Sequence, residues 1–519
     1  MTKPTLAQLR AKTYPDTLDE QLKALGSDPV LHGFTESRER LAADPYRPLY
    51  HFSPPADLMN DPNGLCQWQG RYHLFYQFIP AGQDRAIWGH TVSDDLVHWR
   101  DMPPAIYPDQ EKACFSGQAL VEPNRVVAIY HGVESGNSIA TACDPLLLNW
   151  QMHPGNPVIP IVPVDDNGAP YRIFDPCIWK EHDGYYALSG SYSHGTFRVN
   201  CRGAEYLFHS KDLGTWDFLG KLVEFGFHNE PGEDGAVPNF LPIGNGKHIL
   251  LFFSHKRAGQ YLIGTYDQTT HRFDPEHHGR MNYGPWCIGS LHAPSATIDD
   301  EGRFLVIFNV WEGKPPKNWN NVMTLPRRLS LEGDSSLHMA PAAEIESLRF
   351  DHRRVESMDI ASNGETVLQN IRGKAIEIEA VIEPGAAREV GLCVLRSPDG
   401  AERTRISLFQ REGQRPGTSA LQIDVSEASL RTDVFARPPE TGPFALDAGE
   451  LLRLRIFVDR SIVEVFANER QCLTLRAYPE HEDSSGVSVF ARGGAAKLVS
   501  LDMWHMRSVW PELKNREGT

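Results

Sequence analysis

A short pattern that returns along the chain constrains the fold more than any other feature. The pattern Ser-x-Asp-Leu-x-x-Trp fills residues 93–99 and returns at 210–216, and a weaker echo, Cys-Asp-Pro ending in Asn-Trp, lies at 143–150. The spacing of the three tryptophans suits one four-stranded unit each, with insertions. Repeated units of this kind predict the blades of a β-propeller, although similar hairpins within a sandwich would also give such a pattern.

The segments between these motifs have the composition of short strands. Runs rich in β-branched and aromatic residues alternate with turn clusters, for example at 72–76, 126–130, 248–253 and 304–308. The 43 glycines and 38 prolines suit a turn-rich chain. We therefore predict an all-β fold with a propeller domain over residues 46–340.

The chain changes character beyond the propeller. A length of 519 residues is too great for one ordinary domain. Residues 375–382 and 452–458 alternate between apolar and charged side chains, as half-buried antiparallel strands do. We predict a β-sandwich domain over 355–512, a linker within 335–360 and a helical extension over 1–45.

Charge and composition exclude several partners. The formal net charge of −16 argues against nucleic acid and anionic membranes, and no apolar run is long enough to span a bilayer. The N-terminus lacks the apolar core of a secretory signal, so we expect a cytoplasmic protein, or a secreted one whose leader has been removed. The eight cysteines have no metal-ligand spacing and are expected to be free thiols. No metal and no cofactor is predicted.

The most distinctive segment for chemistry is Tyr50–Pro80. At its centre, Met-Asn-Asp-Pro-Asn-Gly fills residues 59–64 and places Asp61 in a tight turn between apolar strands. Proline and glycine beside Asp61 fix the local backbone, so its carboxylate is held in place. An isolated turn of this kind is common, but this one is followed by further motifs.

Taken in order, these motifs closely resemble glycoside hydrolase family 32, the invertase, inulinase and levanase group of fructan-active enzymes. The nucleophile motif of that family usually has tryptophan where Leu58 stands. The further matches are Trp88-Gly89-His90, residues 93–99, Phe115-Ser116-Gly117, Phe174-Asp175-Pro176, Asn282-Tyr283-Gly284, Leu325-Pro326-Arg327 and residues 458–466. The resemblance spans roughly Pro48 to Met506. It implies five propeller blades and a retaining mechanism at fructofuranosidic bonds.

Such a mechanism needs one carboxylate as nucleophile and one protonated acid for the leaving oxygen. The resemblance makes Asp61 the nucleophile and Asp175 the residue that holds sugar hydroxyls and stabilises the transition state. Phe174 occupies the place of an arginine in the family. Arg172 lies two residues earlier, on the same face of a strand, and would still reach the site.

The proton donor is the weakest part of the match. The family has a glutamate two residues before a proline, but here the residue two before Pro238 is Ala236. Glu233 and Asp234 are the nearest carboxylates, and Gly235 would permit a bulge that turns one of them inward. We choose Glu233 as the catalytic acid because its side chain is longer, and leave Asp234 as the alternative acid and otherwise as a residue that binds the substrate.

The resemblance also implies a shell of residues around the sugar. Asn60 would donate to a sugar hydroxyl, and Trp88 would offer a flat apolar face to the ring. Each aromatic residue of the shell can instead belong to the core of a blade. The remaining candidates are Gln77, Phe115 and Ser116, with Trp286 and Trp319 as weaker candidates for an outer subsite.

These features predict a retaining glycosidase that releases fructose from sucrose, inulin-type or levan-type chains. One alternative keeps the chemistry but transfers the fructosyl group to a sugar hydroxyl, which gives longer chains or a difructose anhydride. Another is a non-catalytic carbohydrate-binding protein, supported only by the absence of a glutamate at Ala236. The sandwich domain is expected to be structural, or to bind polysaccharide or a second copy of the chain.

Overall fold

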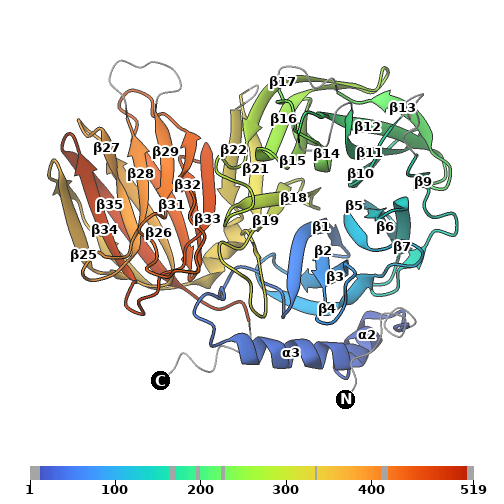
Figure 1. The fold of residues 1–519 in the computed structure, drawn as a ribbon, viewed down its shortest axis with the longest axis horizontal. Helices are drawn as coiled ribbons and strands as arrows, with labels where there is room; N and C mark the ends of the chain where they lie inside the picture. The colour runs from blue at the N-terminus through green and yellow to red at the C-terminus, as the bar shows by residue number, and fades with distance from the viewer. Residues whose placement is uncertain are drawn as a thin grey trace.

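Two β domains lie side by side, and two helices run along one edge of the first (Figure 1). The computed structural model describes residues 12–162, 171–193, 199–223, 228–333, 336–410 and 419–510. The first domain is a propeller, viewed in Figure 1 with its blades arranged around a centre, and the second is a sandwich. The all-β prediction is confirmed for the two domains.

The N-terminal helices α2 (Leu18–Leu25) and α3 (Pro29–Leu41) pack on the outer side of the first blade (Figure 1). Helix α3 begins where the Asp28 carboxylate accepts from the Val30 N–H at 2.8 Å, with proline at the first helical position. Arg38 of α3 donates to Asp101 at 2.7 Å and lies 3.6 Å from the centre of the Trp510 ring. The start of the expected extension, residues 1–11, lies outside the described residues.

The propeller has five antiparallel sheets, each made of consecutive strands. The first strand of each sheet lies nearest the centre of the ring (Figure 1). Blades 1 and 2 comprise β1 (Leu58–Trp68), β2 (Arg71–Ile79), β3 (Ile87–Ser93) and β4 (Trp99–Ile106), then β5 (Cys114–Glu122), β6 (Arg125–Gly132), β7 (Gly136–Ala142), β8 (Gln151–Met152) and β9 (Ile159–Pro160). Blade 3 comprises β10 (Pro176–Glu181), β11 (Gly184–Ser193), β12 (Arg202–Ser210) and β13 (Asp217–Lys221).

Blades 4 and 5 follow the same order. Blade 4 comprises β14 (Ala236–Gly244), β15 (Lys247–Ser254), β16 (Ala258–Asp267) and β17 (Arg272–Arg280). Blade 5 comprises β18 (Leu291–Ile298), β19 (Phe304–Val310), β20 (Val322–Met323), β21 (Arg327–Glu332) and β22 (Ser336–Pro341).

The repeated sequence pattern marks the same turn in blades 1 and 3, between the third and fourth strands. In blade 1 the Asp95 carboxylate accepts from the N–H groups of residues 97 and 98, and in blade 3 Asp212 accepts from those of residues 214 and 215. The leucine after each aspartate has a positive φ, 64° at Leu96 and 69° at Leu213. The aspartate therefore stabilises a turn that a leucine backbone does not favour.

No strand in the described part of the chain is shared between the first and last blades. The ring instead closes through contacts between β1 and β18. The backbone N–H of Leu65 donates to the Ser295 hydroxyl at 3.0 Å, and Asp57 forms a bridge with Trp319. We call this boundary between blades 1 and 5 the closing seam.

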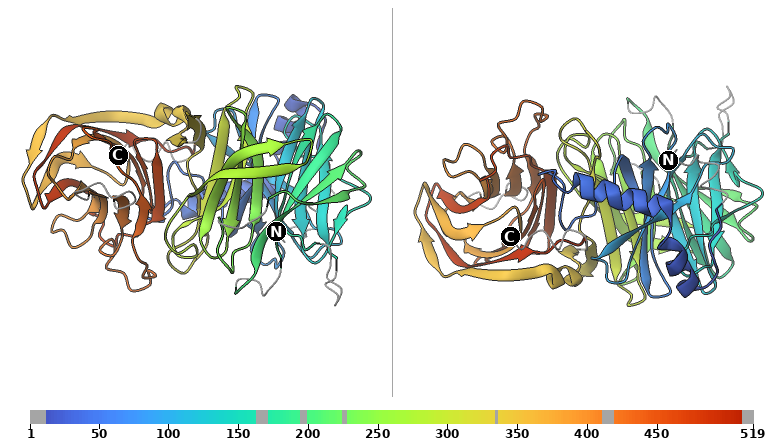
Figure 2. Two further views of the ribbon diagram at one scale, coloured as in Figure 1. Left: turned by 90° about the horizontal axis from the view of Figure 1, so that it is seen from above. Right: turned by 90° about the horizontal axis from the view of Figure 1, so that it is seen from below.

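The second domain is a sandwich of two antiparallel sheets. A 3₁₀ turn, η1 (Ala343–Leu348), leads into it, and the curved layers are seen edge-on in Figure 2. One sheet has the order β23-β35-β26-β31-β32-β33 with β24 on β35, and the other β25-β34-β27-β28-β29-β30. The strands are β23 (Arg349–Val355), β24 (Met358–Ile360), β25 (Gly364–Arg372), β26 (Ala375–Glu383), β27 (Glu389–Arg396), β28 (Thr404–Phe409), β29 (Ala420–Asp424), β30 (Glu440–Pro443), β31 (Leu452–Asp459), β32 (Ile462–Ala467), β33 (Gln471–Arg476), β34 (Gly486–Arg492) and β35 (Ala496–Met506).

The boundary between the domains differs from the expected one. Strand β23 pairs with β35, so residues 349–355 belong to the sandwich rather than to a linker. The last strand of the propeller ends at Pro341, which leaves only η1 between the domains. The final residues of the expected sandwich range, 511 and 512, lie outside the described part of the chain.

A buried charged cluster joins the two domains. The Asp459 carboxylate accepts from the backbone N–H groups of residues 49–51, at 2.7 to 2.9 Å. Glu464 on β32 accepts from His51 at 3.1 Å and pairs with Arg327 on β21. Burial raises the pKa of Glu464, but Arg327 and His51 outweigh it and hold the pKa at about 2. The motif at 458–466 therefore fixes the sandwich to the propeller.

Two negative findings apply to the described residues. None of their helices has the length and apolarity needed to cross a membrane. All eight cysteines lie in this part of the chain and none of them forms a disulfide; Cys143 and Cys287 are exposed and the other six are buried.

Candidate active site

Asp61 lies on β1, the innermost strand of blade 1, and is only 5% exposed. One carboxylate oxygen accepts from the Ser116 hydroxyl at 2.6 Å and from Gln77 Nε2 at 3.3 Å. The other lies 3.0 Å from Nδ1 of His292 on β18. Three elements from blades 1, 2 and 5 thus hold the carboxylate in one orientation.

The same contacts keep Asp61 ionised. Burial raises the pKa of this carboxyl, but the hydrogen bonds from His292 and Ser116 outweigh burial and leave the pKa below its usual range. Burial lowers the pKa of His292, so its ring is neutral at neutral pH and donates through Nδ1–H. An oriented, ionised carboxylate is suited to attack a sugar carbon.

Asp175 faces the same centre from blade 3. It stands immediately before β10, and its carboxyl accepts from the Val237 N–H at 3.3 Å. Burial and then the charges of Asp61 and Asp234 raise its pKa to about 8. The surroundings therefore separate the pKa values of the two carboxyls, so that Asp61 is ionised and Asp175 is protonated at neutral pH.

A chain of amides supports the nucleophile. Asn309 donates to Asn60 at 3.2 Å, Asn60 donates to Gln77 at 3.2 Å, and Gln77 donates to Ser116 at 2.6 Å. The predicted residues Asn60, Gln77 and Ser116 are thus brought together around Asp61. Their contacts with a sugar stay a prediction.

The two predicted aromatic residues differ in exposure. Phe115 is 40% exposed beside Ser116 and is available to a ligand. Trp88 has no exposed surface, packs against Phe75 and Tyr130, and donates to the Phe115 carbonyl at 2.8 Å. The prediction that Trp88 presents a face to the sugar is therefore wrong, because the ring belongs to the blade core.

An apolar wall occupies the place of two charged residues of the predicted family. Phe174 and Trp286 pack against a buried cluster that contains Ala236 and Val237. Val237 has a φ of 49°, which is rare for a β-branched residue. Arg172 lies close enough to Tyr206 for its charge to act on that phenol. Its predicted contact with the sugar stays a prediction.

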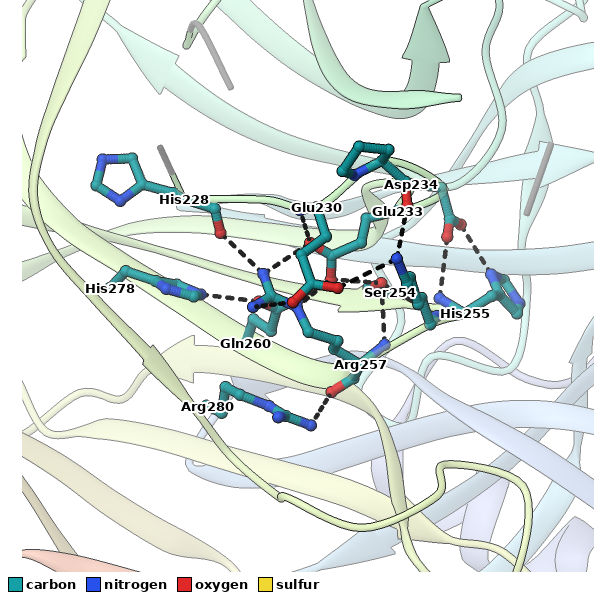
Figure 3. A network of polar contacts seen from close by, with 12 residues as sticks. His228, Glu230, Glu233, Asp234, Ser254, His255, Arg257, Gln260, His278 and Arg280 are labelled. Atoms are coloured by element: carbon teal, nitrogen blue, oxygen red, sulfur yellow. Dashed lines mark hydrogen bonds and ion pairs between the residues drawn. The ribbon is translucent and has the colours of Figure 1, made fainter. Parts of the chain in front are cut away.

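Glu233 is the centre of a polar network rather than a free acid (Figure 3). Arg257 donates to both of its oxygens, at 2.8 and 2.7 Å. Ser254, Gln260 and the backbone N–H of Glu230 add bonds of 3.0, 2.8 and 2.6 Å. Burial raises the pKa of Glu233, but these partners outweigh it and lower the pKa overall. A buried, ionised and fully bonded carboxylate contradicts the prediction that Glu233 donates the proton.

Asp234 points the opposite way and binds His255 (Figure 3). Its two oxygens accept from the backbone N–H of His255 at 2.9 Å and lie 2.8 Å from the ring Nδ1. Asp234 is 1% exposed, so the prediction that it contacts substrate directly is also wrong. Trp319 is buried and donates to Asp44 at 2.8 Å, which removes it from any outer subsite.

Sequence reasoning missed three residues at this centre. His292 orients Asp61, His255 stands beside them, and Glu205 lies buried near Asp175. Both oxygens of Glu205 lack a partner among the described residues, and burial, then Asp234 and Asp175, raise its pKa well above the usual range. His292 lies on β18 in the last blade, His255 follows the end of β15, and Glu205 lies on β12, the third strand of its blade. No local sequence motif marks any of them.

No group of three or more histidine, cysteine, aspartate or glutamate residues in the described ranges is arranged to hold a metal ion. The centre instead offers one ionised carboxylate and one protonated carboxyl, with an exposed aromatic ring nearby. This arrangement is that of a site where one carboxylate attacks a carbon atom and a protonated carboxyl holds the substrate by hydrogen bonds.

Comparison with known proteins agrees with this chemistry. The sequence models "Glycosyl hydrolases family 32 N-terminal domain" and "Glycosyl hydrolases family 32 C terminal" match residues 51–341 and 344–505. The chain is 30% identical to the levanase of Bacillus subtilis, over 91% of this chain and 72% of that one. It is 27% identical to an insoluble isoenzyme of beta-fructofuranosidase from Arabidopsis thaliana, over 91% and 93%. The structure of fructan 1-exohydrolase IIa from Cichorium intybus is similar, with a TM-score of 0.78, 26% identity and coverage of 90% and 98%.

Proposed function

The chain belongs to glycosyl hydrolase family 32, as a glycosidase of the β-fructofuranosidase and fructan hydrolase type, and we propose that it removes terminal fructosyl residues with retention from sucrose and fructo-oligosaccharides. The observation that carries this proposal is the geometry of Asp61. It is an ionised carboxylate at the centre of the ring, bonded to Ser116 and His292 from neighbouring blades.

In the first step, an Asp61 oxygen attacks the anomeric carbon of the fructosyl unit, and the bond to the leaving sugar breaks. In the second, water attacks the anomeric carbon from the face that the leaving sugar had occupied, and the bond to Asp61 breaks. The two inversions together retain the configuration. Positive charge develops on the sugar ring between these states, and the carboxyl of Asp175 would hydrogen-bond to sugar hydroxyls there.

The choice of substrate class rests on charge and on the relatives. With a net charge of −16 and several carboxyls at the centre, the protein is better suited to neutral sugars than to anionic ones. Among related proteins, a structure of the Cichorium intybus exohydrolase contains 1-kestose, and one of a Bombyx mori β-fructofuranosidase contains sucrose. The exposed Phe115 ring would pack against the apolar side of a bound sugar.

Transfer to a sugar acceptor is the second candidate, and one observation favours it. The apolar wall of Phe174, Ala236 and Trp286 offers few polar groups that would hold an attacking water. A sugar hydroxyl that reaches the fructosyl-enzyme first would give a longer chain or a difructose anhydride.

Product analysis tests the proposal. The protein is incubated separately with sucrose, 1-kestose, inulin and levan, and the products are resolved by chromatography with mass detection. We expect free fructose, and methyl β-fructofuranoside when methanol is present, because retention traps the alcohol on the original face. Products lighter by one water than difructose would identify transfer. No product from any of the four, with an equally silent Asp61→Asn control, would refute both candidates.

A further inference from the structure

The proton donor is absent from its expected position. Ala236, the first residue of β14, belongs to the apolar cluster against which Phe174 and Trp286 pack, and it has no group that can carry a proton. Glu233 is bonded to Arg257 and ionised. A sugar alkoxide leaves slowly unless its oxygen is protonated, so another side chain must supply the proton.

His255 and Asp234 form a fixed pair beside this position. Asp234 holds both the backbone N–H and the ring Nδ1 of His255, at 2.9 and 2.8 Å (Figure 3). The carboxylate is fully buried, whereas 19% of the histidine side chain is exposed. A buried carboxylate that orients a more exposed imidazole is an arrangement that general acid–base catalysis uses.

The pair lies next to both the vacant position and the nucleophile. Ala236 pairs with Phe253 across β14 and β15, and His255 follows two residues after Phe253. The His255 ring lies 5.4 Å from the Trp286 ring and 6.4 Å from the His292 ring, centre to centre. His292 contacts Asp61 directly, and the charge of His255 acts on Asp61. His255 therefore faces the reaction centre.

We propose that His255 is the acid and base of this enzyme and that Asp234 positions it, a proposal that rests on the fructosidase function above. Protonated His255 gives the proton on Nε2 to the leaving oxygen while Asp61 attacks the anomeric carbon and the glycosidic bond breaks. The neutral imidazole then takes a proton from water as the water oxygen bonds to the same carbon. The bond to Asp61 breaks, which restores the carboxylate and the protonated imidazole.

Two carboxyls near this position are less suited to the role. Glu205 has no exposed surface, and the backbone of Gly235 covers it so closely that a Cβ there would lie 1.8 Å from its oxygen. Asp175 stands immediately before the first strand of blade 3, and its carboxyl already accepts from the Val237 N–H at 3.3 Å. The variants Asp175→Asn and Glu205→Gln distinguish both carboxyls from His255.

The test compares substrates that differ in their need for a proton. Sucrose has a poor leaving group, whereas p-nitrophenyl β-D-fructofuranoside releases a stable anion without protonation. We expect His255→Ala to lower kcat/KM on sucrose by about 10² to 10⁴-fold and on the aryl substrate by less than about tenfold. Azide, which needs no base, should restore turnover of the aryl substrate and give fructosyl azide. Asp234→Asn should show the same pattern with a smaller loss on sucrose.

The chain contains a matched control. His98 and Asp95 form a pair with the same geometry, with bonds of 2.8 Å from both the backbone N–H and the ring Nδ1, on the outside of blade 1. His98→Ala should leave both substrates unaffected. Turnover of the aryl substrate also shows that each variant is folded, and His255→Gln serves as a second variant.

Three outcomes would overturn the proposal. They are an unchanged rate on sucrose in His255→Ala, an equal loss on both substrates, or the leaving-group pattern in Asp175→Asn or Glu205→Gln instead. A wild-type protein that is inactive on every fructoside would refute the proposed function itself, which keeps the two failures apart.

Discussion

Replacing Glu233 by glutamine tests whether this carboxylate is structural. Glu233 receives five hydrogen bonds, two of them from Arg257, and is fully buried. A glutamine keeps the shape but turns an NH₂ group toward donors, and it leaves the guanidinium with only the more exposed Glu230, at 3.5 Å, as counter-charge. The side chain of Arg257 is 20% exposed, so water offsets part of that loss.

The cost can be worked from these contacts. Removing one partner of a buried ion pair costs about 3–5 kcal/mol, and the partial exposure of Arg257 reduces this to about 2–4 kcal/mol. An unfolding entropy of about 2.1 cal/mol/K per residue gives about 1.1 kcal/mol/K for 519 residues. Glu233→Gln should therefore lower the melting temperature by about 2–4 °C at pH 7.

Calorimetry against pH checks both size and sign. The pKa of Glu233 is lowered in the folded protein, so its stabilisation is present above the ordinary glutamate pKa, about 4.3, and is lost as pH falls through the folded value. The difference between wild type and variant should shrink below about pH 4. An unchanged melting temperature, together with a selective loss of sucrose hydrolysis, would refute the structural assignment and restore Glu233 as the acid.

Three further variants test other parts of the structure. Asp61→Asn should lower the initial rate on sucrose by at least about 10⁴-fold with no loss of melting temperature, and a residual rate near wild type would exclude it as nucleophile. Glu464→Gln leaves Arg327 buried without its partner and should destabilise the protein by about 3–5 kcal/mol in calorimetry, whereas an unchanged transition would mean that the cluster does not hold the domains. Gly235→Ala brings a Cβ to 1.8 Å from Glu205 and should cost about 1–3 kcal/mol, which Glu205→Ser should relieve in the double variant; additive effects would contradict that contact.

The sequence predicts those residues whose surroundings are local. Asp61 sits in a motif whose proline and glycine lie at the irregular register of β1 rather than in the expected turn, and the blade pattern carries its own capping aspartate at Asp95 and Asp212. Strand alternation places Ile376 and Ile378 inside the sandwich, and both are fully buried. In each case, the residues that decide the structure are neighbours along the chain.

The sequence fails where a side chain is directed by residues far away. Glu233 and Asp234 are adjacent and both acidic, and only the turn between β15 and β16, which supplies Arg257 and His255, decides which way each one turns. Trp88 is aromatic and close to the site, but burial between strands decides its role. His292 lies 231 positions from Asp61, so no local pattern could connect them.

The closing seam gives this enzyme a built-in check on its own assembly. Asp61 belongs to the first blade and His292 to the last, and they meet only where the two ends of the ring come together (Figure 1). A chain that has formed only the first four blades has the partners Gln77 and Ser116 of its nucleophile but lacks the strand that carries His292. The complete active site therefore forms only when blade 5 packs against blade 1. Recovery of activity during refolding reports this ring closure rather than the formation of the individual sheets.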